Sequence, residues 1–532
     1  MSNKQGNRPN ILLIMADDMG FSDLGCYGSE IDTPNLDKLA ANGARFSQMY
    51  NCARCCPTRA SILTGLYPHQ AGVGHMVNDA GVGKEYQGFL RDDCITIAEA
   101  LKSSSYHTLL SGKWHVGGAY QANKPETWSP GEPEHPIPTQ RGFDEFYGML
   151  GGGGSYFNPP YMMRNEELIE EGGGGYYLTD AISENAVQML RDVPNDEPFF
   201  LYVAYTAPHW PLHALPEDIE KYVGRYLDAG WDGVRQKRYE NLKKLGLLNN
   251  EWALSPRDPS APPWKDTPNK EWEDLRMAVY AAQVDRMDQG IGRIMAELEK
   301  DGKLENTLIM FLSDNGGCAE FLAEDTNHAE PFRYDIPTHD GRPMRIGNTP
   351  KIKPGPDDTF MSYDLPWANA SNSPFRLFKH WVHEGGISTP FIVHWPGKVR
   401  SNQIFHNPIH IVDIMATCLD VSGTVYPTEY NGKAITPLEG ESFAPLVFGN
   451  REWQREEPIF WEHEGNRAVR AGKWKLVCKY PGKWELYNME VDRTELNDLS
   501  GQEPAVVEEL SKLYEQWATR CGVREWPLKP HS

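Results

Sequence analysis

Long hydrophobic runs are missing from this chain. None of its 532 residues lies in an apolar stretch that approaches the roughly 18 to 20 residues of a membrane-spanning helix. The first ten residues are too polar and too few to form a secretory signal peptide. We therefore expect a cytoplasmic protein with no membrane partner, or a periplasmic or secreted one whose leader was removed before this numbering begins.

Basic residues are also scarce. The chain has 52 Lys and Arg against 74 Asp and Glu, which gives a formal net charge of -22. Such a surface repels nucleic-acid phosphates and anionic lipid headgroups, so we expect no nucleic-acid partner. If the substrate is an anion, the positive charge that attracts it must be concentrated in one place.

Cysteine is used sparingly, but three of the nine cysteines fall between residues 52 and 56. An odd number scattered over a long chain does not indicate a disulfide framework. A zinc site is disfavoured because no second ligand pair lies at a suitable spacing. The cluster is then either a set of buried, inert thiols or the place of a reactive one. Pro57 is typical of a first helical turn, which would place Cys55 at a helix N-terminus, where the dipole and free amides favour anionic character.

The length exceeds what one hydrophobic core usually supports, so we expect a large domain and a smaller one. Buried strands are predicted at 10–15, 106–110, 199–205 and 308–312. Helices predicted at 33–43, 180–193 and 274–300 alternate with them. This order predicts an α/β fold with a large, mostly parallel sheet flanked by helices.

The pattern changes near residue 458 to short strands at 459–462, 474–479 and 484–488, followed by a helix at about 503–520. We therefore predict a large domain at 1–455 and a small antiparallel sheet with one helix at 456–532. The stretch 212–272 is too long for a simple connection and is interpreted as an insertion near the mouth of the site. The glycine runs 151–154 and 172–175 are interpreted as the ends of a flap.

Polar side chains follow each of the four predicted central strands. In open α/β sheets the functional crevice lies outside the carboxyl ends of the strands, so these side chains should meet at one edge. The residues are Asp17 and Asp18 after the first strand, Lys113 and His115 after the second, His209 after the third, and Asp314 and Asn315 after the fourth.

Four of these residues offer oxygen ligands. Asp17, Asp18, Asp314 and Asn315 suit a hard cation such as Ca²⁺ or Mg²⁺ and do not suit zinc. Each pair could instead only cap a strand or a turn. Two such pairs at equivalent strand ends favour one divalent cation.

The segment that begins at Cys55 resembles a known signature. Cys55-x-Pro57-Thr58-Arg59, followed by Leu63-Thr64-Gly65, is similar to the C-x-P-S-R motif of the formylglycine-dependent sulfatases. In that family a formylglycine-generating enzyme oxidises the first cysteine to an aldehyde, whose hydrate is the nucleophile. Of the three clustered cysteines, only Cys55 has Pro two places on and Arg four places on, so it is the residue expected to be converted.

Further segments match the family in the same order along the chain. Two of them, 17–20 and 313–316, resemble its metal-binding segments. The others are 111–117, 207–209, Lys379 ahead of Glu384-Gly-Gly-Ile, and 485–490 in the tail. The resemblance implies an alkaline-phosphatase-like fold. It also implies a sulfuric ester hydrolase that acts on an aryl sulfate or a sulfated carbohydrate.

The resemblance assigns roles to the candidate residues. The cation, Ca²⁺ in preference to Mg²⁺, would be held by Asp17, Asp18, Asp314 and Asn315. Among the catalytic residues, Arg59 would steady the hydrate, and Lys113 and Lys379 would neutralise the charge of the sulfate. His115 would take a proton from the hydrate. His209, together with Lys379, would protonate the leaving alcohol.

Two departures and two alternatives stand beside this hypothesis. Thr58 replaces the usual Ser, and Ser388-Thr389-Pro390 stands where the family often has Arg-Val-Pro. One alternative is a phosphate or phosphonate ester hydrolase of the same superfamily, and the other is a non-catalytic, metal-dependent binding protein. The remaining histidines that we considered are expected to be structural, and they are His69, His75, His213, His383 and His394.

Overall fold

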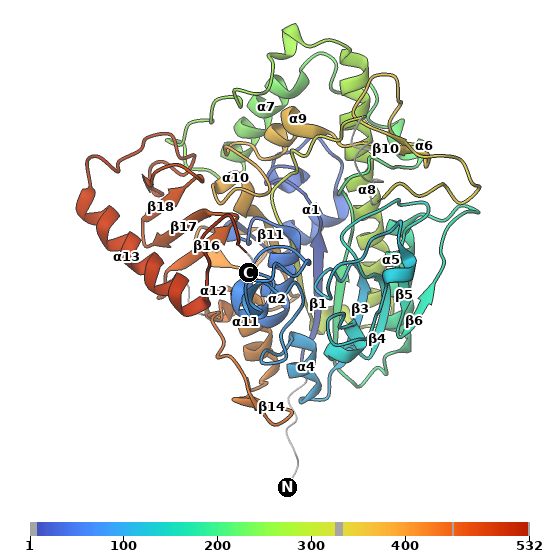
Figure 1. Cartoon of the computed structure of the whole chain (residues 1–532), viewed down its shortest axis with the longest axis vertical. Helices are drawn as coiled ribbons and strands as arrows, with labels where there is room; N and C mark the ends of the chain where they lie inside the picture. Colours follow the sequence, from blue (N-terminus) through green and yellow to red (C-terminus); the bar gives the residue numbers. More distant parts are fainter. Residues whose placement is uncertain (1–7, 325–333, 450–451, 530–532) are drawn as a thin grey trace.

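The computed structural model describes residues 8–324, 334–449 and 452–529. A large mixed sheet runs through the centre of the molecule, and a small second sheet lies toward the C-terminus (Figure 1). In spatial order the large sheet contains β12 (Gln403–Phe405), β2 (Ala44–Tyr50), β11 (Ser388–His394), β8 (Thr307–Ser313), β1 (Asn10–Ala16), β7 (Phe199–Ala204), β3 (His107–Gly112), β4 (Glu145–Met149), β5 (Met162–Arg164) and β6 (Glu167–Ile169), with β13 (Ile409–His410) beside β2.

The four strands predicted from their apolar runs form the middle of this sheet. They lie side by side in the order β8, β1, β7, β3, and all of them are parallel. Strand β1 is buried along its whole length, as expected for a parallel strand covered on both faces. The predicted α/β architecture is therefore confirmed, and the antiparallel strands β11, β5 and β6 make the sheet mixed.

Two groups of helices pack around the sheet. Helix α8 packs against both α1 and α5, and α2, α4 and α11 form a second group (Figure 1). The helices of the described part of the chain are α1 (Pro34–Ala41), α2 (Cys55–Thr64), α3 (Pro68–Ala71), α4 (Ile97–Lys102), α5 (Leu178–Asp192), α6 (Pro216–Ile219), α7 (Gly230–Lys244), α8 (Lys270–Lys300), α9 (Asp364–Ser371), α10 (Glu384–Ile387), α11 (Asp413–Ser422), α12 (Ala444–Phe448) and α13 (Pro504–Cys521). Among these described helices, none is both long and apolar enough to cross a membrane.

The C-terminal sheet has one strand more than the sequence indicated. Its strands are β16 (Ile459–His463), β17 (Asn466–Ala471), β18 (Trp474–Cys478) and β19 (Glu485–Asn488), all antiparallel. Helix α13 packs against β17 and β18. The predicted antiparallel sheet with one helix is confirmed, whereas the domain boundary at 455 stays a prediction.

Four short strands lie outside these sheets. They form two pairs, β9 (Arg345–Ile346) with β10 (Thr359–Phe360), and β14 (Glu429–Tyr430) with β15 (Lys433–Ala434). The stretch 212–272, interpreted as an insertion, contains α6 and α7, and α7 packs against α9. Arg238 on α7 anchors it through an ion pair of 2.5 Å to the buried Asp23.

A buried ionic network joins the C-terminal sheet to the large sheet. Glu384, the first residue of α10, is fully buried and accepts hydrogen bonds from Lys475 on β18 (2.9 Å) and Arg493 (2.8 Å). Tyr50 at the end of β2 donates a third hydrogen bond to the same carboxylate (3.0 Å). Burial alone would raise the pKa of Glu384, but the two cations hold it at about 2. One carboxylate thus links both parts of the molecule.

We predict that Glu384→Gln lowers the free energy of unfolding by about 3–5 kcal/mol, because it leaves Arg493 buried without its carboxylate partner and leaves Lys475 paired with Glu495 alone (2.7 Å). A group whose folded-state pKa is depressed stabilises the protein above its unfolded value, here 4.5, and loses that effect as the pH falls toward 2. The difference in Tm between wild type and variant should therefore be largest above pH 5 and should narrow below it. Thermal unfolding measured between pH 7 and pH 3.5 checks this, and a difference independent of pH would contradict it.

Candidate active site

The carboxyl ends of the central strands bring the predicted polar residues to one edge of the sheet. Backbone hydrogen bonds continue past the strands, from the Asp314 amide to the Ala16 carbonyl (3.1 Å) and from the Lys113 amide to the Ala204 carbonyl (2.7 Å). The residues that directly follow β1, β8 and β3 are therefore held side by side. This is the crevice that an open α/β sheet creates.

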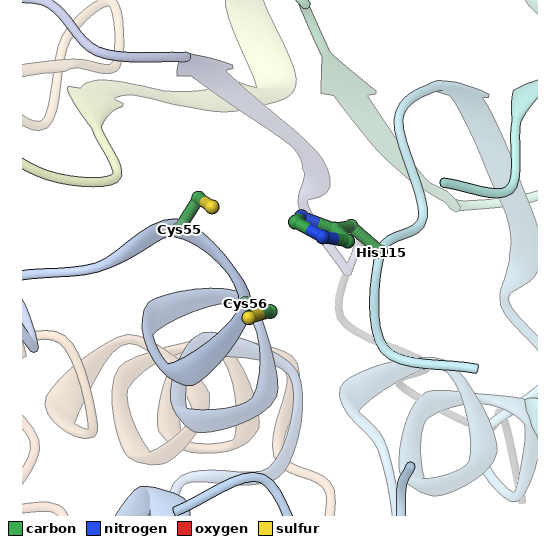
Figure 2. Close-up of side chains that lie close together, drawn as sticks. All are labelled: Cys55, Cys56 and His115. Atoms are coloured by element: carbon green, nitrogen blue, oxygen red, sulfur yellow. The ribbon is translucent and has the colours of Figure 1, made fainter. Parts of the chain in front are cut away.

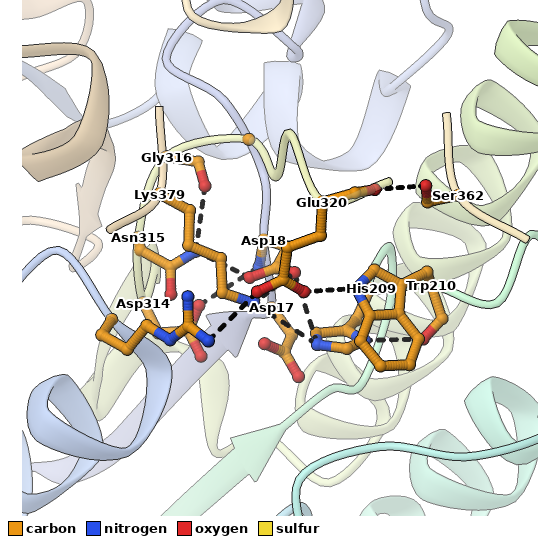
Figure 3. Close-up of polar contacts among 12 residues, drawn as sticks. Asp17, Asp18, His209, Trp210, Asp314, Asn315, Gly316, Glu320, Ser362 and Lys379 are labelled. Carbon is orange, nitrogen blue, oxygen red and sulfur yellow. Dashed lines mark hydrogen bonds and ion pairs between the residues drawn. The ribbon is translucent and has the colours of Figure 1, made fainter. Parts of the chain in front are cut away.

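Three carboxylates and three cations alternate at this edge. Lys113 contacts Asp17 (Nζ to Oδ2, 2.6 Å). Arg59 contacts Asp314 (Nη2 to Oδ2, 2.7 Å), and Lys379 contacts Asp18 (Nζ to Oδ2, 2.8 Å; Figure 3). All six side chains are almost completely buried. At low dielectric such contacts are strong, so the network fixes the position of each charge.

Two buried oxygen atoms of the cluster make no hydrogen bond to the described residues. Oδ1 of Asp17 and Oδ1 of Asn315 are buried and have no hydrogen-bond partner among the described residues. Asn315 donates its amide to Asp18 (2.7 Å), which leaves its carbonyl oxygen free to bind an ion. Burial raises the pKa of Asp17, and burial together with the charge of Asp17 raises that of Asp314. The donor set consists of oxygen only, and it fits a hard divalent cation.

Cys55 opens the buried helix α2, as predicted from Pro57. The side chains of Cys55, Cys56 and His115 lie close together, with one sulfur or nitrogen atom of each within 4.8 Å of the others (Figure 2). The hydrogen bond from Cys56 and the charge of Lys113 hold the pKa of Cys55 well below its usual value, against the effect of burial. Thr58 accepts a hydrogen bond from the Cys52 amide (2.9 Å), so the hydroxyl at this departure from the family motif shapes the loop before Cys55.

Two histidines flank the centre. His209 lies 3.5 Å from Lys379 (Nε2 to Nζ) and 3.4 Å from Asp18 (Nε2 to Oδ2; Figure 3). Burial lowers the pKa of His115 to about 3 and that of His209 to about 4. Both rings are therefore neutral near pH 7. All ten residues predicted for the site lie in this region of the molecule.

A cavity of about 530 Å³ opens on Cys55, His115, His209 and Lys379. Its wall includes residues that the sequence reasoning missed, namely Arg54, Tyr120, Trp210, Glu320 and Tyr334. Arg54 pairs with Glu320 (3.1 Å), and the Trp210 indole donates to the same carboxylate (2.8 Å; Figure 3). Two of the missed residues are sequence neighbours of predicted ones, since Arg54 precedes Cys55 and Trp210 follows His209.

The expectations for the site mouth were only partly right. Gly151 and Gly152 line the cavity, whereas residues 173–175 of the second glycine run border another cavity beside α6. The stretch 212–272 does not line the cavity at Cys55, contrary to our expectation. The reason is that α7 is anchored to Asp23 and Glu30 through Arg238, away from this opening. At the second departure from the family motif, the Ser388 hydroxyl accepts a hydrogen bond from Arg493 (2.6 Å).

Comparison with known proteins identifies the family. The family model described as Sulfatase matches residues 9–424, and the model of the C-terminal region of N-sulphoglucosamine sulphohydrolase matches residues 375–519. The chain belongs to the sulfatase family. It is thus a sulfate ester hydrolase by family, and the resemblance seen in its motifs is confirmed.

Two relatives are more than 30% identical to this sulfatase over most of its length. A sulfatase of Schizosaccharomyces pombe is 31% identical, with 98% of this chain and 96% of that protein covered. The arylsulfatase of Klebsiella aerogenes is 32% identical, with 83% of this chain and 92% of that protein covered.

Solved structures share the fold. The crystal structure of Ps i-CgsB in complex with k-i-k-neocarrahexaose is 27% identical, covers 98% of this chain and 94% of its own, and has a TM-score of 0.66. A further protein was solved with its substrate D-glucosamine-2-N,6-O-disulfate and is 20% identical. The match covers 97% of this sulfatase and 99% of that chain at a TM-score of 0.62, and it supports the fold alone.

Gly316 sets the distance between the Asp314–Asn315 segment and the Lys379 segment. Its amide donates to the Gly386 carbonyl (3.0 Å), and a Cβ at this position would lie 1.9 Å from the Gly385 carbonyl oxygen. We predict that Gly316→Ala lowers the kcat of this sulfatase roughly 100-fold, since displacements near 1 Å have effects of that size. Turnover of a chromogenic sulfate ester measures it. Gly501→Ala is the matched control, because nothing lies within 4 Å of its added Cβ, and equal losses in both variants would contradict the prediction.

Proposed function

We propose that this sulfatase hydrolyses sulfate monoesters at Cys55 after conversion of that residue to formylglycine. The observation that carries the proposal is the position of Cys55, at the first residue of a buried helix, beside His115 and at the base of the cavity. Among the clustered cysteines, only Cys55 is followed by Pro two places on and Arg four places on, as in the maturation motif. Once formed, the aldehyde hydrate supplies a nucleophilic hydroxyl that an ordinary thiol or alcohol cannot replace.

The fixed cations would bind the sulfate group. A sulfate monoester gains negative charge on its leaving oxygen as the S–O bond breaks, so positive charge must already be in place. Lys113 follows β3 and Lys379 lies in the loop before α10, and both side chains are buried, which makes their charges effective. Arg59, at the base, orients Asp314 and steadies the hydrate. This local pocket provides the positive charge that the acidic surface lacks.

Asp17, Asp18, Asp314 and Asn315 would hold one divalent cation, for which we favour Ca²⁺ over Mg²⁺. The support is the all-oxygen donor set with its two unpaired oxygens. Carbonyl and carboxylate ligands in a flexible arrangement are typical of Ca²⁺, whereas Mg²⁺ keeps several of its waters. When bound, the cation polarises a sulfate oxygen and lowers the pKa of a nearby hydroxyl.

Proton transfer is assigned to the two histidines. The neutral ring of His115 lies close to the Cys55 side chain, so it can accept a proton from a hydroxyl at that position. His209 and Lys379 lie 3.5 Å apart at the opposite wall and are positioned to deliver a proton to the leaving alcohol. His115 would thus act as the base of one step, and the pair of His209 and Lys379 as the acid of the other.

The substrate that fits best is a ring carrying a sulfate ester, either an aryl sulfate or a sulfated carbohydrate. Tyr120, Trp210 and Tyr334 line the cavity above the site, and aromatic faces of this kind pack against rings. The bound oligosaccharide of Ps i-CgsB supports the carbohydrate, and the arylsulfatase relative supports the aryl ester. A formylglycine-generating enzyme is the partner required for maturation.

We predict that Cys55→Ala lowers kcat for a chromogenic aryl sulfate by at least roughly 1,000-fold, because the nucleophile is lost. The protein is co-expressed with a formylglycine-generating enzyme, and mass spectrometry of the peptide around Cys55 reports conversion. Cys52→Ala is the control, since Cys52 lacks Pro two places on and should leave conversion and turnover intact.

The same assay separates the alternatives. Turnover of the matching aryl phosphate above that of the sulfate would indicate a phosphate ester hydrolase instead. An unconverted Cys55 thiol combined with no turnover of either ester would indicate a binding protein without catalysis.

For the cation, we predict that exhaustive treatment with a chelator lowers both turnover and Tm, and that Ca²⁺ restores both. Asn315→Leu should weaken Ca²⁺ binding by roughly 10-fold or more, because it replaces one oxygen ligand with an apolar group. Calorimetric titration of Ca²⁺ measures the affinity. Unchanged Ca²⁺ affinity in Asn315→Leu would place the ion elsewhere.

A further inference from the structure

A second cluster of metal-binding side chains lies next to the active-site cavity and takes no part in the chemistry described above. It contains His75, His380, His463 and Glu464. His75 also lines the cavity at Cys55, and His380 directly follows the active-site residue Lys379. The other two residues come from the end of β16 and its turn to β17, in the C-terminal sheet.

The three rings surround the Glu464 carboxylate. Nε2 of His75 lies 2.8 Å from Oε1, Nδ1 of His380 lies 3.3 Å from Oε2, and Nε2 of His463 lies 3.7 Å from Oε1. In a tetrahedral zinc site with bonds of about 2.0–2.2 Å, neighbouring ligand atoms are roughly 3.4 Å apart. One ligand atom from each of His380, His463 and Glu464 lies within 4.8 Å of the others. These three donors are thus already close to the separations that an ion requires, and His75 joins them through its contact with Glu464.

His463 shows that the cluster is incomplete without a ligand. Its side chain is fully buried, yet neither ring nitrogen has a hydrogen-bond partner among the described residues. A buried polar atom that has lost its water without gaining a partner destabilises the fold, so such atoms are rare and call for an explanation. The exposed fraction of the side chain is 24% for Glu464 and 26% for His380, which leaves a route for an ion from solvent.

The backbone adopts left-handed conformations at two of the four residues. Glu464 (φ 51°) and Gly465 (φ 78°) form the two-residue turn between β16 and β17. Turns with positive φ at both positions strongly favour Asn, Asp or Gly at the first. His380 has φ 89°. Strained conformations of this kind at bulky residues cluster at functional sites.

The chemistry of the donors identifies the class of ligand. Imidazole nitrogens and one carboxylate suit zinc and neighbouring transition metals and do not suit Ca²⁺, which prefers oxygen alone. A sulfate or another anion is disfavoured, because the carboxylate at the centre would repel it.

We propose that His75, His380, His463 and Glu464 form a transition-metal site, selective for Zn²⁺, separate from the cation site at Asp17 and Asp18. The ion would join three segments that are distant in sequence, namely the loop after α3, the loop that carries Lys379, and the β16–β17 turn. The His380 amide also donates to the Ala53 carbonyl (2.8 Å), two residues before Cys55. The metal therefore has a structural role, in which it fixes one side of the active-site mouth.

The test uses protein that carries Cys55→Ala, which removes the thiol that could bind zinc together with Cys56 and His115. The protein is treated with a chelator, resupplied with Ca²⁺ and dialysed against micromolar Zn²⁺, and bound zinc is measured by mass spectrometry of the elements. We expect one equivalent of zinc per chain and a rise in Tm of about 3 °C. Substituting Co²⁺ should give the visible absorption of a tetrahedral site with nitrogen ligands.

Two variants and one control locate the ion. Glu464→Gln and His75→Gln each remove one ligand and should lower zinc affinity roughly 100-fold. Glu197→Gln is the matched control, because Glu197 pairs with a single histidine, His107, at a distant surface position. Circular dichroism without metal verifies that each variant is folded. A parent protein that retains no zinc, or a Glu464→Gln variant that binds zinc as tightly as the control, would overturn the proposal.

Discussion

Three carboxylates are buried close together, and their negative charges must be neutralised. Several elements of the fold contribute the cations that do so. Asp17, Asp18 and Asp314 each meet a cation, and the three cations come from the helix that starts at Cys55, from the end of β3 and from the loop before α10. Without these partners the desolvation of the carboxylates would cost several kcal/mol for each charge. The sheet, the nucleophile helix and the Lys379 loop are therefore mutually dependent.

The same alternation of charges gives the site its chemical character. Lys379, for example, is held by Asp18 and also lines the cavity at Cys55. The two oxygens left unpaired, on Asp17 and Asn315, show that the internal balance is not complete. The divalent ion that we propose would complete this balance, with its charge placed beside those of the lysines.

The sequence predicted the fold well where the pattern of apolar residues reflects burial in the folded protein. The four central strands are fully buried, so their runs are continuously apolar, and the polar residues just beyond them were placed correctly at one edge. Strand β17 was missed because Arg467 and Arg470 interrupt its apolar pattern, although Arg470 is itself nearly buried against Tyr50. Lys379 could be assigned only through the family resemblance, since no local pattern marks it.

Other predictions were wrong because contacts between residues far apart in the sequence decide which segments line the cavity. Nothing in the composition of 212–272 reveals that Arg238 anchors it to Asp23, away from the cavity. The cavity wall is built instead from short segments that lie far apart in the sequence, including 76–78, 119–121 and Glu320. His75 was expected to be structural on its own, and its neighbours His463 and Glu464 become visible only after the C-terminal sheet has been placed.

The buried salt bridges of Glu384 have a consequence for the order of events during synthesis. Lys475 and Arg493 leave the ribosome long after Cys55, because they follow it far along the chain. The loop that carries Lys379 cannot be fixed until the C-terminal sheet arrives, and in the finished protein only 3% of Cys55 is exposed. The enzyme that we propose to modify Cys55 would therefore have to reach it on the growing or incompletely folded chain, before the C-terminal sheet packs in place.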